Sequence, residues 1–123
     1  MPRILIADDD SGVREMAARG LARAGHDVTT VSDGLAAVEA LQRAGFDLLV
    51  TDIIMPGLDG IALALKAAKE RPEMAILLMS GFAAERQRAH NLESLFNRIL
   101  SKPFTIKELV AAVDETLAAR RKG

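Results

Sequence analysis

Hydrophobic and polar positions along this 123-residue chain follow two alternating patterns. Short runs in which nearly every residue is apolar are typical of strands buried on both faces of a parallel sheet. Longer stretches repeat apolar residues every three or four positions, as amphipathic helices do. Strands that alternate with helices indicate a parallel sheet covered on both faces. The patterns predict strands at residues 4–7, 27–31, 47–51, 75–79 and 98–100, and helices at residues 13–24, 35–41, 61–68, 83–92 and 106–117.

Capping residues and turn formers separate these elements. Asp10 or Ser11 can cap the first helix, and Gly25 follows its end. No linker or low-complexity segment interrupts the alternation, so we expect one α/β domain over residues 1–119. Residues 120–123 form a basic C-terminal tail, whose cations favour a helix C-terminus.

Composition narrows the class of protein. Half of the residues are hydrophobic and the formal net charge is −1, whereas a nucleic-acid-binding surface is normally strongly basic. The absence of cysteine excludes a disulfide framework and a thiolate zinc site. The sequence shows no signal peptide and no apolar run long enough to cross a bilayer. We therefore expect a cytoplasmic protein that binds neither nucleic acid nor membranes.

Polar side chains follow four of the predicted strands at their carboxyl ends. Asp8 and Asp9 follow the first strand, Asp52 the third, Ser80 the fourth and Lys102 the fifth. In open parallel sheets, sites form in the crevice beyond these ends, so we expect these side chains to share one pocket. Three carboxylates close together repel one another unless a cation offsets their charge, and Mg²⁺ prefers such oxygen ligands. A carboxylate can also attack phosphorus, and we assign Asp52 as the nucleophile.

Each of these residues taken alone has a simpler explanation. An acidic run such as residues 8–10 often only caps a helix, and a strand-end Asp or a Ser-Gly pair often only starts a turn. A lysine in a loop is usually solvated. We expect Lys102 to be mostly solvated apart from the contact of its ammonium group with the acids. Pro103 can fix a tight turn, with a cis peptide bond that aims the lysine inward.

Together these residues resemble the receiver domain of two-component response regulators, the CheY-like family. The resemblance covers residues 3–117, nearly the whole chain. Each motif is weak alone, but their order and spacing together are specific. The motifs are Asp8-Asp9; Thr51-Asp52-Ile53-Ile54-Met55-Pro56-Gly57-Leu58-Asp59-Gly60; Met79-Ser80-Gly81; and Lys102-Pro103-Phe104.

The resemblance implies a single-domain flavodoxin-like fold, a doubly wound sheet of five parallel strands in order 2-1-3-4-5 with five helices. It also implies a stand-alone response regulator of a two-component phosphorelay, whose partners are a histidine kinase or histidine phosphotransfer protein and a protein effector. Such a protein is not an enzyme beyond self-catalysed phosphoryl transfer and self-dephosphorylation. The implied roles are phosphate acceptor for Asp52, contacts to the phosphoryl oxygens for Ser80 and Lys102, and Mg²⁺ ligands for Asp9, Asp52 and the backbone carbonyl of Ile54, with Asp8 acting through water.

One position departs from the family pattern. Many members carry Tyr or Phe three residues before the lysine, and that ring changes rotamer with phosphorylation, but this chain has Ile99 there. Phe82 is the nearest aromatic substitute, although simple packing is the better interpretation. Residues 80–82 and 85–91 also resemble the CpdR group of single-domain receivers. That resemblance implies an adaptor that delivers proteins to the ClpXP protease through ClpX.

Other classes of protein fit the residues less well. An aspartyl phosphatase of the haloacid-dehalogenase type carries a second Asp two residues after its nucleophile, and here that position is Ile54, so rapid turnover is not expected. A binding module independent of phosphorylation would bury these charges without purpose, at a cost in free energy. A nucleotide-binding role is disfavoured because the chain has no Gly-x-x-x-x-Gly-Lys-[Ser/Thr] loop.

Overall fold

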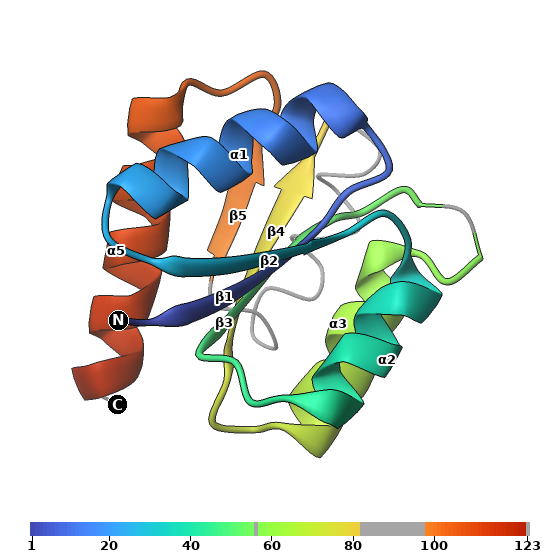
Figure 1. The fold of residues 1–123 in the computed structure, drawn as a ribbon. Helices are drawn as coiled ribbons and strands as arrows, with labels where there is room; N and C mark the ends of the chain where they lie inside the picture. The colour runs from blue at the N-terminus through green and yellow to red at the C-terminus, as the bar shows by residue number, and fades with distance from the viewer. Residues whose placement is uncertain (56, 82–97, 123) are drawn as a thin grey trace.

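One parallel sheet organises the protein. The computed structural model describes residues 1–55, 57–81 and 98–122. Within them, the strands lie in the order β2-β1-β3-β4-β5, which confirms the expected topology (Figure 1). The strands are β1 (Arg3–Ala7), β2 (Asp27–Val31), β3 (Leu48–Asp52), β4 (Ala75–Ser80) and β5 (Arg98–Ser101).

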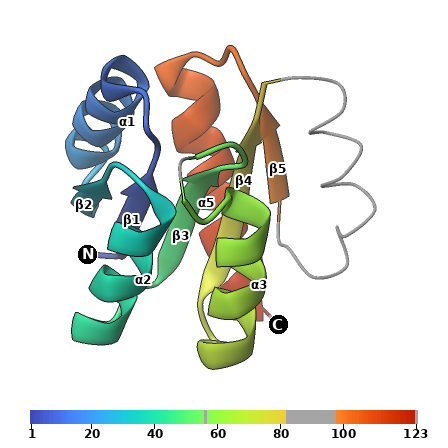
Figure 2. The ribbon, with the colours of Figure 1, turned by 90° about the vertical axis from the view of Figure 1, so that its right-hand side faces the viewer.

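Helices cover both faces of the sheet. In the described part of the chain they are α1 (Ser11–Arg23), α2 (Gly34–Arg43), α3 (Gly60–Glu70) and α5 (Ile106–Lys122). Figure 1 and Figure 2 show α1 and α5 on one face and α2 and α3 on the other. The remaining helix of the five that we predict, at residues 83–92, falls outside the described residues. None of the helices in the described ranges is long and apolar enough to cross a membrane.

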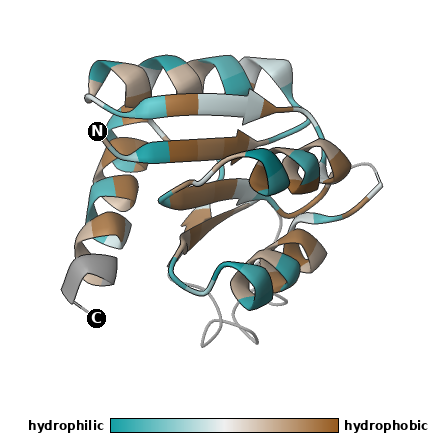
Figure 3. Ribbon diagram, turned by 60° about the horizontal axis from the view of Figure 1, so that its bottom comes forward, coloured by the Kyte–Doolittle hydropathy of each residue, from teal (hydrophilic) through white to brown (hydrophobic). Residues whose placement is uncertain are grey.

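The strand side chains alternate between two hydrophobic layers. Ile4 and Ile6 of β1 pack in the layer beneath α1 and α5, whereas Leu5 and Ala7 pack in the layer beneath α2 and α3. All residues of β3 and β4 are buried, which explains why these segments are apolar without alternation. Figure 3 shows mainly hydrophobic inner strands beneath helices with mixed stripes. Each fully buried leucine or isoleucine stabilises the fold by roughly 1.5–3 kcal/mol. The buried inner strands therefore hold the residues at their carboxyl ends in fixed positions.

Capping residues that are adjacent in the sequence mark the ends of the helices. The side chains of Asp10, Asp33 and Asp59 accept hydrogen bonds from backbone N–H groups in the first turns of α1, α2 and α3. Of the two predicted caps for α1, the structure shows Asp10. Gly25 follows the end of α1 with a φ of 95°, a left-handed conformation that glycine adopts without strain.

The register of the strands brings their carboxyl ends together. Asp8 comes directly after the last paired residue of β1, beside the end of β3, where Asp52 lies. Ser80 comes one residue after the partner of Asp52 on β4. Lys102 follows the residue of β5 that pairs with Ser80. Two acids, a hydroxyl and a lysine therefore lie side by side at the carboxyl ends of neighbouring strands.

Candidate functional site

A cluster of three carboxylates lies at the carboxyl ends of the strands. Asp8, Asp9 and Asp52 each offer one oxygen atom, and these atoms lie within 4.8 Å of one another. Asp8 and Asp52 are buried, whereas Asp9 is exposed and opens the cluster to solvent. The three acids therefore lie close together at the carboxyl ends of the strands, as predicted. A set of oxygen donors of this kind suits Mg²⁺, which binds through one or two carboxylates and keeps several waters.

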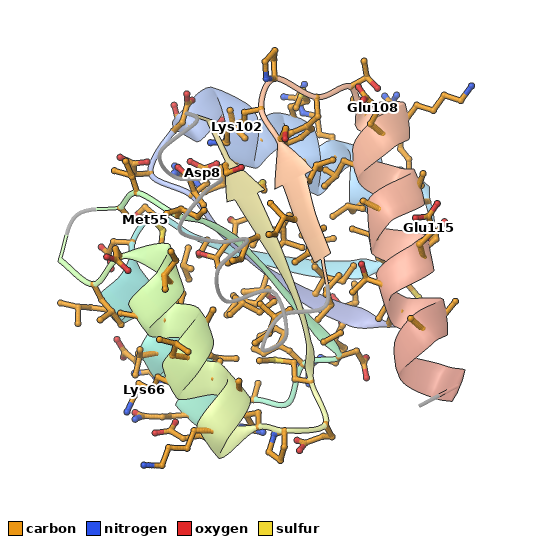
Figure 4. The ribbon with its side chains drawn as sticks, turned by 180° about the vertical axis from the view of Figure 1, so that it is seen from behind. Asp8, Met55, Lys66, Lys102, Glu108 and Glu115 are labelled. Atoms are coloured by element: carbon orange, nitrogen blue, oxygen red, sulfur yellow. The ribbon has the colours of Figure 1, made fainter. Side chains whose placement is uncertain are left out.

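Lys102 lies against the two buried carboxylates. Its Nζ donates a hydrogen bond to Oδ2 of Asp8 at 2.9 Å and lies 3.3 Å from Oδ2 of Asp52. Figure 4 shows Lys102 and Asp8 next to each other at the carboxyl ends of the strands. The peptide bond between Lys102 and Pro103 is cis, as predicted. One cation is thus shared between two buried acids.

The prediction that Lys102 is mostly solvated is wrong. Only 20% of its side chain is exposed. The residue borders an apolar cavity of about 430 Å³ that Val13, Met16 and Phe104 also line, and its ammonium group is held by the buried acids. Lysine commonly buries its methylene groups along apolar surface while its charged end finds a polar partner. Lys102 is therefore a largely buried ion-pair partner.

Burial and the charges of neighbouring side chains together set the pKa values in the site. Burial, opposed by Lys102 and reinforced by the charge of Asp8, raises the pKa of Asp52 from 3.8 to about 6. Burial alone would lower the pKa of Lys102, but its hydrogen bond to Asp8 and the charges of both acids outweigh it, so the pKa of Lys102 is raised. At neutral pH, Asp52 is therefore mostly ionised and Lys102 carries its charge.

Ser80 contributes a buried hydroxyl. The residue is 0% exposed, and its Oγ has no hydrogen-bond partner among the described residues. A buried polar group without a partner costs free energy, so such groups are rare unless a ligand uses them. The backbone N–H of Lys102 donates to the carbonyl of Ser80 at 2.7 Å. This bond joins the residue after β5 to the last residue of β4. It therefore holds the backbone of Lys102 next to the backbone of Ser80.

Backbone groups hold the two buried carboxylates in place. The N–H of Asp10 donates to Oδ1 of Asp8 at 2.9 Å, and the N–H of Ile53 donates to Oδ1 of Asp52 at 3.0 Å. The N–H of Gly60 donates to the carbonyl of Ile53 at 2.7 Å. A Cβ atom at Gly60 would lie 1.8 Å from the carbonyl oxygen of Asp52, so only glycine fits there. The start of α3 thus packs directly on the backbone that carries Asp52.

The other predicted positions lie around this cluster or beyond the described chain. Ile54 follows β3 with 53% of the residue exposed, and the role of its carbonyl as a metal ligand stays a prediction. Ile99 is partly buried and packs against the hydrophobic layer beneath α2 and α3. Phe82 and residues 85–91 lie outside the described residues, so the predictions about them are not tested.

Sequence reasoning missed two residues that support the site. Arg14 reaches back from α1, and its Nη1 donates to the backbone carbonyl of Asp8 at 2.8 Å. Gly60 is the point where α3 meets β3. The signal for Arg14 was its place in the first turn of α1, next to the apolar Val13, on a helix that begins directly after the acids. Gly60 closes the family motif at residues 51–60, but glycine is common in any turn, so the residue by itself did not indicate a contact with β3.

Comparison with known proteins identifies the family of the chain. The family described as "Response regulator receiver domain" matches residues 4–114. The chain is 40% identical over 119 residues to the response regulator receiver protein CpdR of Brucella abortus, which covers 97% of this chain and 99% of that protein. It is 38% identical over 116 residues to the transcriptional activator protein PfeR of Pseudomonas aeruginosa, covering 94% of this chain but 38% of PfeR. The match therefore spans nearly all of CpdR but less than two fifths of PfeR.

Solved structures show the same architecture. A CheY-like response regulator receiver domain protein from Methanospirillum hungatei superposes with a TM-score of 0.91 at 26% identity, over 99% of this chain and 98% of the other. A Francisella response regulator receiver domain gives a TM-score of 0.86 at 28% identity, over 97% of this chain and 98% of the other. The predicted CheY-like fold is confirmed.

Proposed function

Because the chain belongs to the response regulator receiver domain family, we propose that it is a phosphoacceptor whose Asp52 receives a phosphoryl group from a histidine kinase or a histidine phosphotransfer protein. One observation carries the proposal. Asp52 lies 3.3 Å from the ammonium group of Lys102, and the buried hydroxyl of Ser80 nearby lacks a partner among the described residues. A phosphoryl group spreads negative charge over several oxygens and needs such donors. A purely structural ion pair accounts for the lysine but leaves the serine unexplained.

The transfer step forms a bond between a carboxylate oxygen of Asp52 and phosphorus, while the bond from phosphorus to the donor histidine nitrogen breaks. Only the ionised carboxylate attacks, and a pKa of about 6 leaves Asp52 mostly ionised at neutral pH. Lys102 and Ser80 donate to the phosphoryl oxygens of the product. The product is an acyl phosphate, and its later hydrolysis returns the carboxylate.

The carboxylate cluster fits Mg²⁺. Its donor atoms are all oxygens within 4.8 Å of one another, and it faces solvent through Asp9. In this proposal Asp9, Asp52 and the carbonyl of Ile54 would hold the ion, and Asp8 would act through water. When bound, the ion offsets the charge that the carboxylates and the phosphoryl group bring together.

Incubation with acetyl phosphate and Mg²⁺ tests the acceptor role. We expect one added phosphoryl group, labile to hydroxylamine, which peptide mass spectrometry locates on Asp52. Asp52→Asn should abolish the labelling, whereas Asp27→Asn, which changes an exposed aspartate at the start of β2, should leave it unchanged. Full labelling of Asp52→Asn would contradict the acceptor assignment. Labelling at an unchanged rate in EDTA would contradict the metal site.

The output of the switch is a change in a protein-binding surface. The similarity to CpdR, at 40% identity over nearly the full length of both chains, supports a role as an adaptor for the ClpXP protease. A pull-down of purified ClpX with this protein, with and without the acyl-phosphate mimic beryllofluoride, tests that role. We expect binding in one state and not in the other. No binding in either state would remove the adaptor role and leave the phosphoacceptor role intact.

A further inference from the structure

Arg14 connects α1 to the strand end that carries the acids. Its side chain is partly buried, and its Nη1 donates to the backbone carbonyl of Asp8 at 2.8 Å. That carbonyl belongs to the peptide unit that joins Asp8 to Asp9. A peptide unit is planar, so holding its carbonyl fixes the plane of the whole unit. The hydrogen bond from Arg14 therefore fixes the orientation of the peptide that leads into Asp9.

Asp8 and Asp9 depend on this bond to different degrees. The side chain of Asp8 is held on both oxygens, by the N–H of Asp10 at 2.9 Å and by Lys102 at 2.9 Å. The side chain of Asp9 is exposed, and within the described structure its carboxylate has no hydrogen-bond or ion-pair partner. The orientation of Asp9 therefore depends on its backbone, and Arg14 holds that backbone.

We propose that Arg14 is a positioning residue for a divalent cation, because it holds the Asp8–Asp9 peptide so that the Asp9 carboxylate stays beside Asp52. This inference rests on the proposed function, in which Asp9 is a ligand of Mg²⁺. Arg14 acts through its hydrogen bond rather than as a counter-charge. The cation that pairs with the buried acids in the described structure is Lys102.

The two modes of action predict opposite changes in affinity. A guanidinium close to a cation site repels the cation, so a charge effect means that removing Arg14 tightens Mg²⁺ binding. A positioning effect means that removing Arg14 weakens it. Loss of a group that orients a metal ligand typically lowers metal affinity about ten-fold or more. The direction of the change therefore separates the two explanations.

Magnesium titration of the unphosphorylated protein, by calorimetry or by NMR, is the test. Arg14→Met keeps an apolar stem and removes both the charge and the donors, and we expect it to raise the Kd for Mg²⁺ about ten-fold. Arg19→Met, which changes an exposed arginine of the same helix, is the matched control and should leave the Kd unchanged. Arg14→Lys keeps the charge and a donor, and its Kd should lie between the two. In an Asp9→Asn background, Arg14→Met should add little, because both changes act on the same ligand.

Wild-type or tighter Mg²⁺ binding by Arg14→Met would overturn the proposal. If circular dichroism shows that Arg14→Met does not fold, Arg14→Lys decides, and an unchanged Kd for it overturns the proposal. Labelling of Asp52 by acetyl phosphate separates this inference from the proposed function. If the wild-type protein binds Mg²⁺ and is labelled while the Arg14 variants bind equally well, only the positioning role fails. If the wild-type protein binds no Mg²⁺, the metal site and the positioning role fail together.

Discussion

Replacing Asp52 with asparagine should make the metal-free, unphosphorylated protein more stable at neutral pH. In the folded chain Asp52 is 8% exposed and shares Lys102 with the fully buried Asp8. Burial, opposed by Lys102 and reinforced by Asp8, raises the pKa of Asp52 from 3.8 to about 6. The fold therefore holds an ionised carboxylate at a cost in free energy. A neutral amide of nearly the same shape does not carry that cost.

The size and sign of the effect follow from proton linkage. Because the pKa of Asp52 is higher in the folded state, the folded protein binds the proton more tightly than the unfolded chain between about pH 4 and pH 6. Stability is therefore lost as the pH rises through this window, and the loss is complete by about pH 7. Each pKa unit corresponds to about 1.4 kcal/mol, so the ionised carboxylate costs up to about 3 kcal/mol. This cost already includes the attraction of Lys102, which lowers the pKa of Asp52, so we expect Asp52→Asn to gain up to about 3 kcal/mol at pH 7.5.

Urea unfolding followed by circular dichroism measures this gain, since the chain has no Trp or Tyr to report by fluorescence. The experiment is run in EDTA between pH 4 and pH 8. The difference in free energy of unfolding between Asp52→Asn and the wild-type protein should be close to zero at pH 4 and should grow as the pH rises. The control is Asp27→Asn, which changes an exposed aspartate that pairs with Arg3 and should alter stability by less than about 1 kcal/mol. The burial argument would be refuted if Asp52→Asn were no more stable at pH 7.5, or if its advantage widened on acidification.

Three further predictions follow from the same site. Lys102→Ala should lower the free energy of unfolding at pH 7.5 by about 3 kcal/mol, because it leaves buried carboxylates unpaired; an unchanged urea midpoint would contradict this. Gly60→Ala should cost more than about 3 kcal/mol and slow the labelling of Asp52, because its Cβ would overlap the carbonyl oxygen of Asp52. The control Gly45→Ala, where no atom lies within 4 Å, should change stability by less than about 1 kcal/mol in the same assay. Ile54→Asn should speed the decay of phosphorylated Asp52 several-fold, because a polar side chain can orient the attacking water; a phosphoprotein time course with equal decay would remove this idea.

Much of the fold could be predicted because its causes are local. The apolar runs of β1, β3 and β4 are long enough to be recognised one at a time, and the aspartates that cap the helices precede them directly in the chain. Local patterns did not select the order of the strands. Parallel strands with similar apolar composition can pair in several orders, and the expected order came from the resemblance to the receiver family. The hydrogen-bonded register then confirmed it.

The site also has features that the sequence determined and features that only the tertiary structure decided. The sequence by itself determined which side chains stand at the carboxyl ends of the strands, because a strand end and the residue after it are adjacent in the chain. The tertiary structure alone decided how those side chains meet. Lys102 contacts Asp8 across 94 positions of sequence and is buried by that contact, which no local pattern shows. The reach of Arg14 to the backbone of Asp8 and the fit of Gly60 against Asp52 are likewise set by the packing of helices on the sheet. Burial, hydrogen-bond satisfaction and pKa depend on which distant segments come within a few ångströms, and only the folded chain determines that.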